Sequence, residues 1–252
     1  MTFKELYDNL SNRYPNAWKC EWDNDGIMCS SNLDAEVNNV LIALDITMDT
    51  VNYAIKNGFD TIISHHPLVF RSQKSLMPLN YTQNKLINLI KNDINVMSFH
   101  TRLDASAPGV NDVLANLLDL ENIVPDTMDQ IGRIGIYSDE ISLKEFAQKV
   151  KEALSCPFVL YNGNKKVKKV YVVGGDGKDL IENAIICGAD TIITGRASYN
   201  TTIDAKDMGL NIVEAGHFYT ENPVCNQIEA DVLSICPSIK TNIYNSNSIK
   251  CI

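Results

Sequence analysis

The chain has 252 residues, of which 45% are hydrophobic and 21% charged, enough apolar material for one large domain or two packed halves. A formal net charge of −9 argues against a broad basic surface for nucleic acid, and no apolar stretch approaches the ~20 residues that span a bilayer. The seven cysteines are odd in number and scattered without a C-x-x-C pair, so we expect reduced thiols in the cytoplasm and no zinc–thiolate site.

The first segments of the chain predict a helix and a turn. Residues 1–15, MTFKELYDNLSNRYP, have an amphipathic helical pattern and lack the apolar run of a signal peptide. Residues 22–26, WDNDG, are typical of a turn, and the tryptophan beside the polar residues indicates a packed loop that lines a cleft.

Two stretches, residues 40–67 and 170–197, match at a constant offset of 130. Each begins with a β-branched run that predicts a buried strand, followed by a turn and a helix of about ten residues. Gly58 ends the first helix and Gly188 the second, and each is followed by a second strand with the sequence TII. This pattern predicts a β-α-β unit with parallel strands and a right-handed crossover in each copy.

Both copies continue with another helix, a strand at 95–99 or 211–215, and the motif H-x-x-x-[D/E]. We therefore predict an α/β fold of duplicated βαβ-containing halves, residues 1–125 and 126–252, forming one compact unit without an inserted domain. The alternative is a chance match of two ordinary units. The common register of G-x-D-T-I-I-[S/T] argues against chance.

All the histidines follow directly, or after one residue, on a predicted strand; they are His65, His66, His100 and His217. Open α/β sheets place ligand sites at the carboxyl ends of their strands. The second copy has Gly195 and Arg196 where the first has His65 and His66. We therefore predict one composite site that lies between the halves and takes residues from both.

Histidine and carboxylate are a common ligand set for catalytic divalent metals. The predicted ligands of two divalent ions, whether zinc, iron or manganese, are His65, His66, Asp104, His217 and Glu221, with a carboxylate bridging the ions.

Other interpretations of these residues stay open at this point. One ring of the adjacent pair His65 and His66 could be buried and the other solvated, and Asp104 and Glu221 could be surface carboxylates. Neighbouring side chains of an extended strand point to opposite sides, so the adjacent pair needs a bend or two metals. His100 is a ligand, an orienting group or a proton-transfer group.

Two further segments have simpler interpretations. Residues 173–179, VGGDGKD, predict a tight turn and not a phosphate-binding loop, because the motif lacks G-x-G-x-x-G and contains an aspartate. The lysines at 165, 166, 168 and 169 predict a solvated hairpin or loop edge.

Six segments occur in an order that resembles the NIF3-like family, whose members are named GTP cyclohydrolase 1 type 2 homologs. They are WDNDG, ALDIT, DTIISHHPLVF, HTRLDASAPGVND, GADTIITG and GHFYTE. The resemblance covers nearly the whole chain. It implies a duplicated α/β fold, a dinuclear metal centre and a toroidal homohexamer built from dimers. It also implies that the five predicted ligands bind the metals and that His100 lies beside them.

The chain departs from the family pattern at two positions. Relatives commonly have an acidic residue after I-T-G and a histidine four positions later, where this chain has Arg196 and Asn200. If these residues contact the substrate, its identity or charge differs. Longer relatives carry an inserted domain between the halves, and this chain is too short to hold one.

The residues and the resemblance together predict a dinuclear metal-dependent hydrolase that acts on a small-molecule, nucleotide-like substrate. Water activated by the metals would attack the substrate, and His100 would transfer the proton as the catalytic residue. The cations nearest the site in sequence are Arg71, Lys74, Arg102 and Arg196. The alternative is a non-catalytic metal-binding protein with a regulatory or scaffold role.

Overall fold

The computed structural model describes residues 1–252, and its internal contacts divide the chain into two compact units. The first unit comprises Met1–Ser106 and Cys225–Ile249, and the second comprises Ala107–Val224 and Lys250–Ile252. Each unit contains a mixed sheet with helices, which confirms the predicted α/β class. The predicted boundary of the sequence repeat, between residues 125 and 126, stays a prediction.

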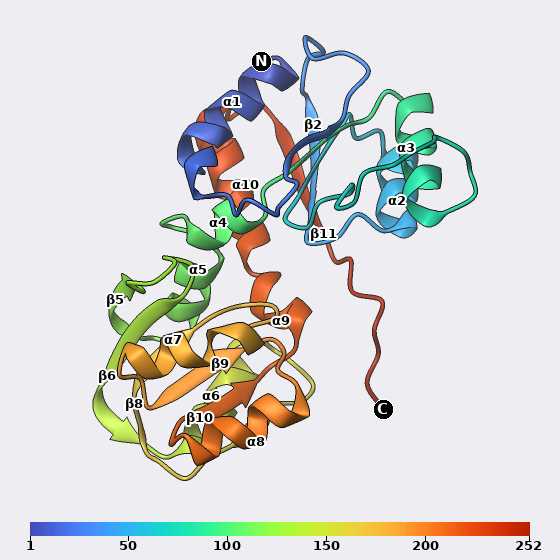
Figure 1. Cartoon of the computed structure of the whole chain (residues 1–252). Helices are drawn as coiled ribbons and strands as arrows, with labels where there is room; N and C mark the ends of the chain where they lie inside the picture. The colour runs from blue at the N-terminus through green and yellow to red at the C-terminus, as the bar shows by residue number, and fades with distance from the viewer. The chain divides into compact units, whose positions relative to one another are not determined.

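The first unit is built on a five-stranded sheet (Figure 1). Its strands, in spatial order, are β1 (Gly26–Cys29), β4 (Asn95–Ser98), β3 (Thr61–Ser64), β2 (Asn39–Ala43) and β11 (Lys240–Tyr244). The last four are parallel, and β1 pairs antiparallel with β4. Because β11 comes from the last part of the chain and pairs with β2, residues Cys225–Ile249 belong to the first unit.

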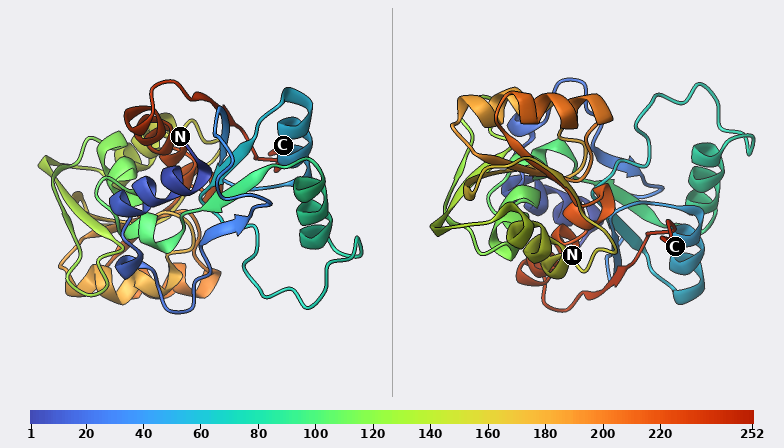
Figure 2. Two further views of the ribbon diagram at one scale, coloured as in Figure 1. Left: turned by 90° about the horizontal axis from the view of Figure 1, so that it is seen from above. Right: turned by 90° about the horizontal axis from the view of Figure 1, so that it is seen from below.

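Helices cover both faces of this sheet, as the two views of Figure 2 show. On one face, α2 (Met48–Asn57) and α3 (Tyr81–Lys91) pack against the register partners Leu41, Ile62 and Val96. On the other face lie α1 (Phe3–Arg13) and α10 (Val224–Ile235). The predicted N-terminal helix is confirmed, with a capping box at its first turn that satisfies backbone N–H groups.

The second unit has a six-stranded sheet between two layers of helices. Its strands, in spatial order, are β5 (Glu121–Pro125), β6 (Arg133–Ile141), β8 (Val167–Val172), β9 (Thr191–Thr194), β10 (Asn211–Glu214) and β7 (Leu160–Asn162). Val172, Ile193 and Val213 face α5 (Val110–Leu117) and α6 (Leu143–Ala153). The opposite face packs against α7 (Ile181–Ile186) and α8 (Tyr199–Asp207).

The β-α-β repeat predicted from the sequence is present in both units with the same register. Val40 pairs with Thr61 in the first unit, and Val170 pairs with Thr191 in the second, so the offset of 130 holds for both members of the pair. The helix α2 has ten residues as predicted, whereas in the second copy a 3₁₀ turn, Lys178–Leu180, precedes a shorter α7.

An aspartate at the start of the second repeat strand fixes the register in each copy. Asp60 Oδ2 accepts hydrogen bonds from the backbone N–H groups of Asn38 and Asn39, both at 2.9 Å. Asp190 Oδ2 accepts the equivalent bonds from Lys168 and Lys169, at 2.9 and 2.7 Å. Each carboxylate therefore ties its own strand to the start of the preceding parallel strand.

The structure contains no helix that is both long and apolar enough to cross a bilayer.

We predict that Asp190→Ala lowers the free energy of unfolding by about 1–3 kcal/mol, because two backbone N–H groups lose a charged acceptor. The measurement is the urea midpoint of the whole chain. Asp207→Ala is the matched control; this aspartate is exposed at the end of α8, and its loss should change stability by less than about 0.5 kcal/mol. Equal midpoints for the two variants would show that Asp190 does not fix the register.

Candidate metal centre

Three of the four histidines meet at the carboxyl edge of the first sheet. His65 and His66 follow β3, and His100 follows β4, two residues after its end. Since β3 and β4 are parallel and Ser64 pairs with Ser98, both strands end at the same height. One ligand atom from each histidine lies within 4.8 Å of those from the other two, a spacing that suits a metal site.

The adjacent histidines lie close together because the backbone bends after β3. The chain leaves the strand conformation at His65, and the Ser64 hydroxyl donates a hydrogen bond of 2.8 Å to the carbonyl oxygen of His66. The two imidazole centroids are 5.0 Å apart, and each lies within 5.7 Å of the His100 ring. The structure thus has a bend after β3, one of the two arrangements, a bend or two metals, that would let neighbouring side chains share a site.

Each of the three rings is held by an oxygen acceptor at Nδ1. The partners are the Phe99 carbonyl for His65 at 2.9 Å, the Asp45 carboxylate for His66 at 2.7 Å and the Asp23 carboxylate for His100 at 2.8 Å. Carbonyl and carboxylate oxygens can only accept, so Nδ1 carries the proton in all three rings. Nε2 then has the lone pair that a metal ligand needs, with the ring orientation set by the acceptor.

Asp23 is the buried anchor of His100. Burial raises the pKa of this carboxyl group, but hydrogen bonds from His100 and Thr101 outweigh burial and lower the pKa to about 2. For His100, burial lowers the pKa, while the hydrogen bond to Asp23 and the charges of Asp104 and Asp23 raise it to a value above the ordinary one. Asp23 is therefore ionised at neutral pH and fixes both His100 and the start of α4 (Thr101–Ala105).

Arg102, one of the four cations nearest the site in sequence, is paired inside the first unit. The Arg102 guanidinium is fully buried, and its Nε donates to Asp25 at 2.9 Å. It also lies over the Phe99 ring, 4.6 Å from the centroid. This buried ion pair holds α4 against the segment 22–26, so the Arg102 guanidinium is not exposed to a substrate.

The predicted carboxylate ligand of the first unit lies next to this histidine group. Asp104 is on α4, and its Oδ1 is 3.6 Å from His65 Nε2. The H-x-x-x-D motif therefore places its histidine at the end of a strand and its acid one helical turn later, on the same side.

The second unit repeats this arrangement with His217 and Glu221. They are the first and last residues of the short helix α9 (His217–Glu221), which follows β10. His217 Nε2 lies 2.9 Å from Glu221 Oε2, a contact between positions i and i+4. The structure thus pairs the two predicted ligands of this unit, and their union with the first group in one composite site stays a prediction.

Glycines of the second unit leave room for α9. A Cβ atom on Gly195 would lie 2.6 Å from Thr220 Oγ1 and 2.7 Å from the His217 Cα atom. A Cβ atom on Gly175, whose φ is +64°, would lie 2.1 Å from Glu221 Oε1. The segment 173–179 was predicted as a tight turn and is instead a loop that runs into the 3₁₀ helix Lys178–Leu180. Gly174 and Gly175 of this loop lie against Glu221.

The groups that orient the histidines were not predicted from the sequence. Asp45 and Asp23 lie 21 and 77 residues from the rings they hold, so no local spacing could show the pairing. Asp45 does follow a predicted strand at the same edge of the sheet as His65, and that position was the available signal. Gly175 and Gly195 were likewise missed as the residues that make room for α9.

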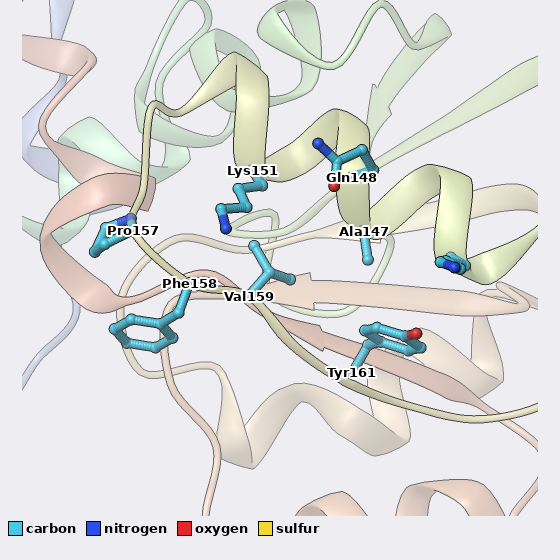
Figure 3. A pocket seen from close by; sticks show the side chains of 8 residues that line it. Ala147, Gln148, Lys151, Pro157, Phe158, Val159 and Tyr161 are labelled. Atoms are coloured by element: carbon cyan, nitrogen blue, oxygen red, sulfur yellow. The ribbon is translucent and has the colours of Figure 1, made fainter. Parts of the chain in front are cut away.

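A separate cavity of about 280 Å³ lies on the second unit, between α6 and the segment 157–161 (Figure 3). Lys144, Lys151, Phe158 and Tyr161 are among the residues that line it. The lining contains no histidine, carboxylate or cysteine, so this cavity cannot coordinate a catalytic metal and is distinct from the candidate centre.

A family model described as Duf34/NIF3 (NGG1p interacting factor 3) matches residues 1–250. The chain belongs to this family. The resemblance on which the sequence analysis relied is thereby confirmed, together with the fold class that it implied.

Named relatives and a solved structure agree with the family model. The chain is 34% identical over 229 residues to a GTP cyclohydrolase 1 type 2 homolog of Clostridium acetobutylicum, covering 87% of this chain and 85% of the relative. It is 33% identical over 240 residues to the homolog of Clostridium perfringens, covering 92% and 91%. A crystal structure of a Staphylococcus aureus protein superposes with a TM-score of 0.90 at 27% identity, covering 100% and 99% of the two chains.

We predict that Gly175→Ala disturbs the second unit more than Gly188→Ala does. Both residues have positive φ, +64° and +70°, so both substitutions cost about 1–2 kcal/mol of backbone strain. Only at position 175 would the methyl group also displace Glu221, whereas near Gly188 the nearest atom is Lys169 Nζ at 3.7 Å. The measurements are the urea midpoint and the metal content after dialysis. Equal losses in the two variants would contradict the role given to Gly175.

Proposed function

We propose that the chain is a dinuclear metal-dependent hydrolase of the kind named GTP cyclohydrolase 1 type 2 homolog, acting on a nucleotide-like small molecule. The observation that carries the proposal is the group of three histidines with Nδ1 held by oxygen acceptors and ligand atoms within 4.8 Å of one another. Rings fixed in this tautomer suit divalent metals of the zinc, iron or manganese type. The names of the clostridial relatives support the substrate class.

The donor set fits such ions by its chemistry. In this proposal His65, His66, Asp104, His217 and Glu221 bind two ions. The ions would polarise the substrate and lower the pKa of a water molecule that attacks it. Asp45 and the Phe99 carbonyl orient the first two histidines.

His100 is assigned the proton transfer. Asp23 holds its Nδ1 at 2.8 Å, and one ligand atom of the ring lies within 4.8 Å of those of His65 and His66. An imidazole held in this way accepts a proton at Nε2, and the charge that results is stabilised by the Asp23 carboxylate. Its place in the histidine group also suits a metal ligand. The metal content of a His100 variant distinguishes a ligand from a proton carrier.

We predict that Asp104→Ala and Glu221→Ala each remove much of the bound metal, whereas His100→Ala largely spares it. A bridging carboxylate neutralises two cations at once, while a proton carrier contributes little to their affinity. Elemental analysis of dialysed protein measures this, with two ions per chain expected for the wild type. Asp139→Ala, at an exposed position on β6, is the control. A loss in His100→Ala as large as in the carboxylate variants would make His100 a ligand.

The catalytic proposal is tested by a turnover screen of metal-loaded protein with nucleotides and phosphoesters. We expect hydrolysis that a chelator abolishes, and a decrease of at least about 100-fold in Glu221→Ala, since metal activation of water is lost. If no substrate turns over while a partner protein is bound equally well with and without metal, the chain is the scaffold of the alternative interpretation.

The proposed assembly is a homohexamer in the cytoplasm. Closed symmetric rings satisfy every interface without open-ended growth, and a ring would confine a small substrate near several centres. Light scattering should give six times the 28.1 kDa of one chain. A mass of one chain that does not change with concentration or added metal would refute the hexamer and leave the metal site untouched.

A further inference from the structure

Two exposed aromatic side chains of the first unit lie beside His100. The Trp22 side chain is 65% exposed and that of Phe70 is 48% exposed. Their ring centroids are 6.2 Å apart, and each centroid is also 6.2 Å from that of His100. The three rings are steeply inclined to one another, at 64°, 77° and 88°, so they form the corner of an aromatic box.

The segment that carries Trp22 is fixed by its next three residues. Asp23 binds His100 and Thr101, and Asp25 binds Arg102. The Asn24 side chain donates to the carbonyl oxygen of Val69, the residue before Phe70. The loops that carry the two exposed rings are therefore fastened to each other and to the histidine group.

Rigid exposure of two large rings needs a physical reason. A tryptophan left largely in water gives up the burial free energy of a large apolar side chain, and a neighbouring phenylalanine in the same state enlarges the patch. A flexible loop could fold such rings inward, but the hydrogen bonds of residues 23–25 oppose that movement. The geometry therefore favours a ligand that covers the rings when it binds.

We propose that Trp22 and Phe70 bind one planar heteroaromatic ring of a small-molecule ligand and place it beside His100. A planar ligand ring would stack on one of the two side chains and meet the other edge-on, so that both make a favourable aromatic contact. Arg71 follows Phe70 and is exposed, which favours a ligand with a negative charge next to its ring. The proposal rests on the proposed function only in locating the ligand at the histidine group.

The stacking is measured with two ligands that differ by the ring alone. Guanosine 5′-monophosphate and ribose 5-phosphate share the phosphate and sugar, so the ratio of their dissociation constants reports the base. The full chain is loaded with Zn²⁺ and titrated by calorimetry. We expect the nucleotide to bind at least about tenfold more tightly than ribose 5-phosphate, in line with the known contribution of base–aromatic stacking.

Variants of Trp22 and Phe70 test whether these two rings cause the difference between the two dissociation constants. Phe70→Leu and Trp22→Leu should each bring the ratio toward one, whereas Phe158→Leu, at an exposed phenylalanine of the second unit, should leave it unchanged. Metal content is measured in parallel and should be unchanged in all three. In a Trp18→Phe background, Trp22 is the one remaining tryptophan, and its fluorescence should be quenched by the nucleotide alone.

Several results would overturn the inference. A wild-type ratio near one would do so, as would a ratio that Phe70→Leu and Trp22→Leu leave unchanged. Tighter binding of choline than of the nucleotide would assign the box to a quaternary cation. Failure of the proposed function would give a different result. If the chain hydrolyses nothing but the ratio of dissociation constants still depends on Trp22 and Phe70, the binding site stands without the activity. If the chain turns over a substrate but the ratio of dissociation constants does not depend on Trp22 and Phe70, only the inference about these two rings is wrong.

Discussion

The candidate metal centre depends on the parallel pairing of β2, β3 and β4 in one fixed register. Asp60 sets that register at the amino end, because its carboxylate accepts hydrogen bonds from two backbone N–H groups at the start of β2. At the opposite edge, the strands end at equal heights and carry Asp45, His65 and His100. A slip of one residue would turn these side chains to the other face of the sheet, so the site and the fold are specified together.

The two copies of the repeat share this strand register and differ at the carboxyl ends of their strands. Asp190 repeats the hydrogen bonds of Asp60 at the offset of 130, which shows that the scaffold is common. At the same offset, Asp45 and His65 correspond to Gly175 and Gly195. The glycines leave the space that α9 occupies with His217 and Glu221, so each copy carries a different part of the predicted ligand set at its strand ends.

The sequence predicted the parts of the structure that depend on local pattern. The β-α-β units, the helices ended by Gly58 and Gly188 and the strand-end histidines follow from periodicity and glycine placement, and all are present. Strand β11 was not predicted, because its pairing with β2, from the far end of the chain, leaves no local signature. For the same reason the acceptors Asp23 and Asp45 were missed, and the burial of Arg102 against Asp25 was not foreseen.

The central claim is that an oxygen acceptor holds Nδ1 of His65, His66 and His100, and that the proposed metals bind His65 and His66 at Nε2. Anomalous diffraction from crystals of metal-loaded protein tests it most directly. The account predicts two anomalous peaks about 3.5–4 Å apart, with Nε2 of His65 and His66 within bonding distance and their Nδ1 contacts to Phe99 and Asp45 retained. Coordination through Nδ1, or metal peaks remote from these histidines, would contradict it.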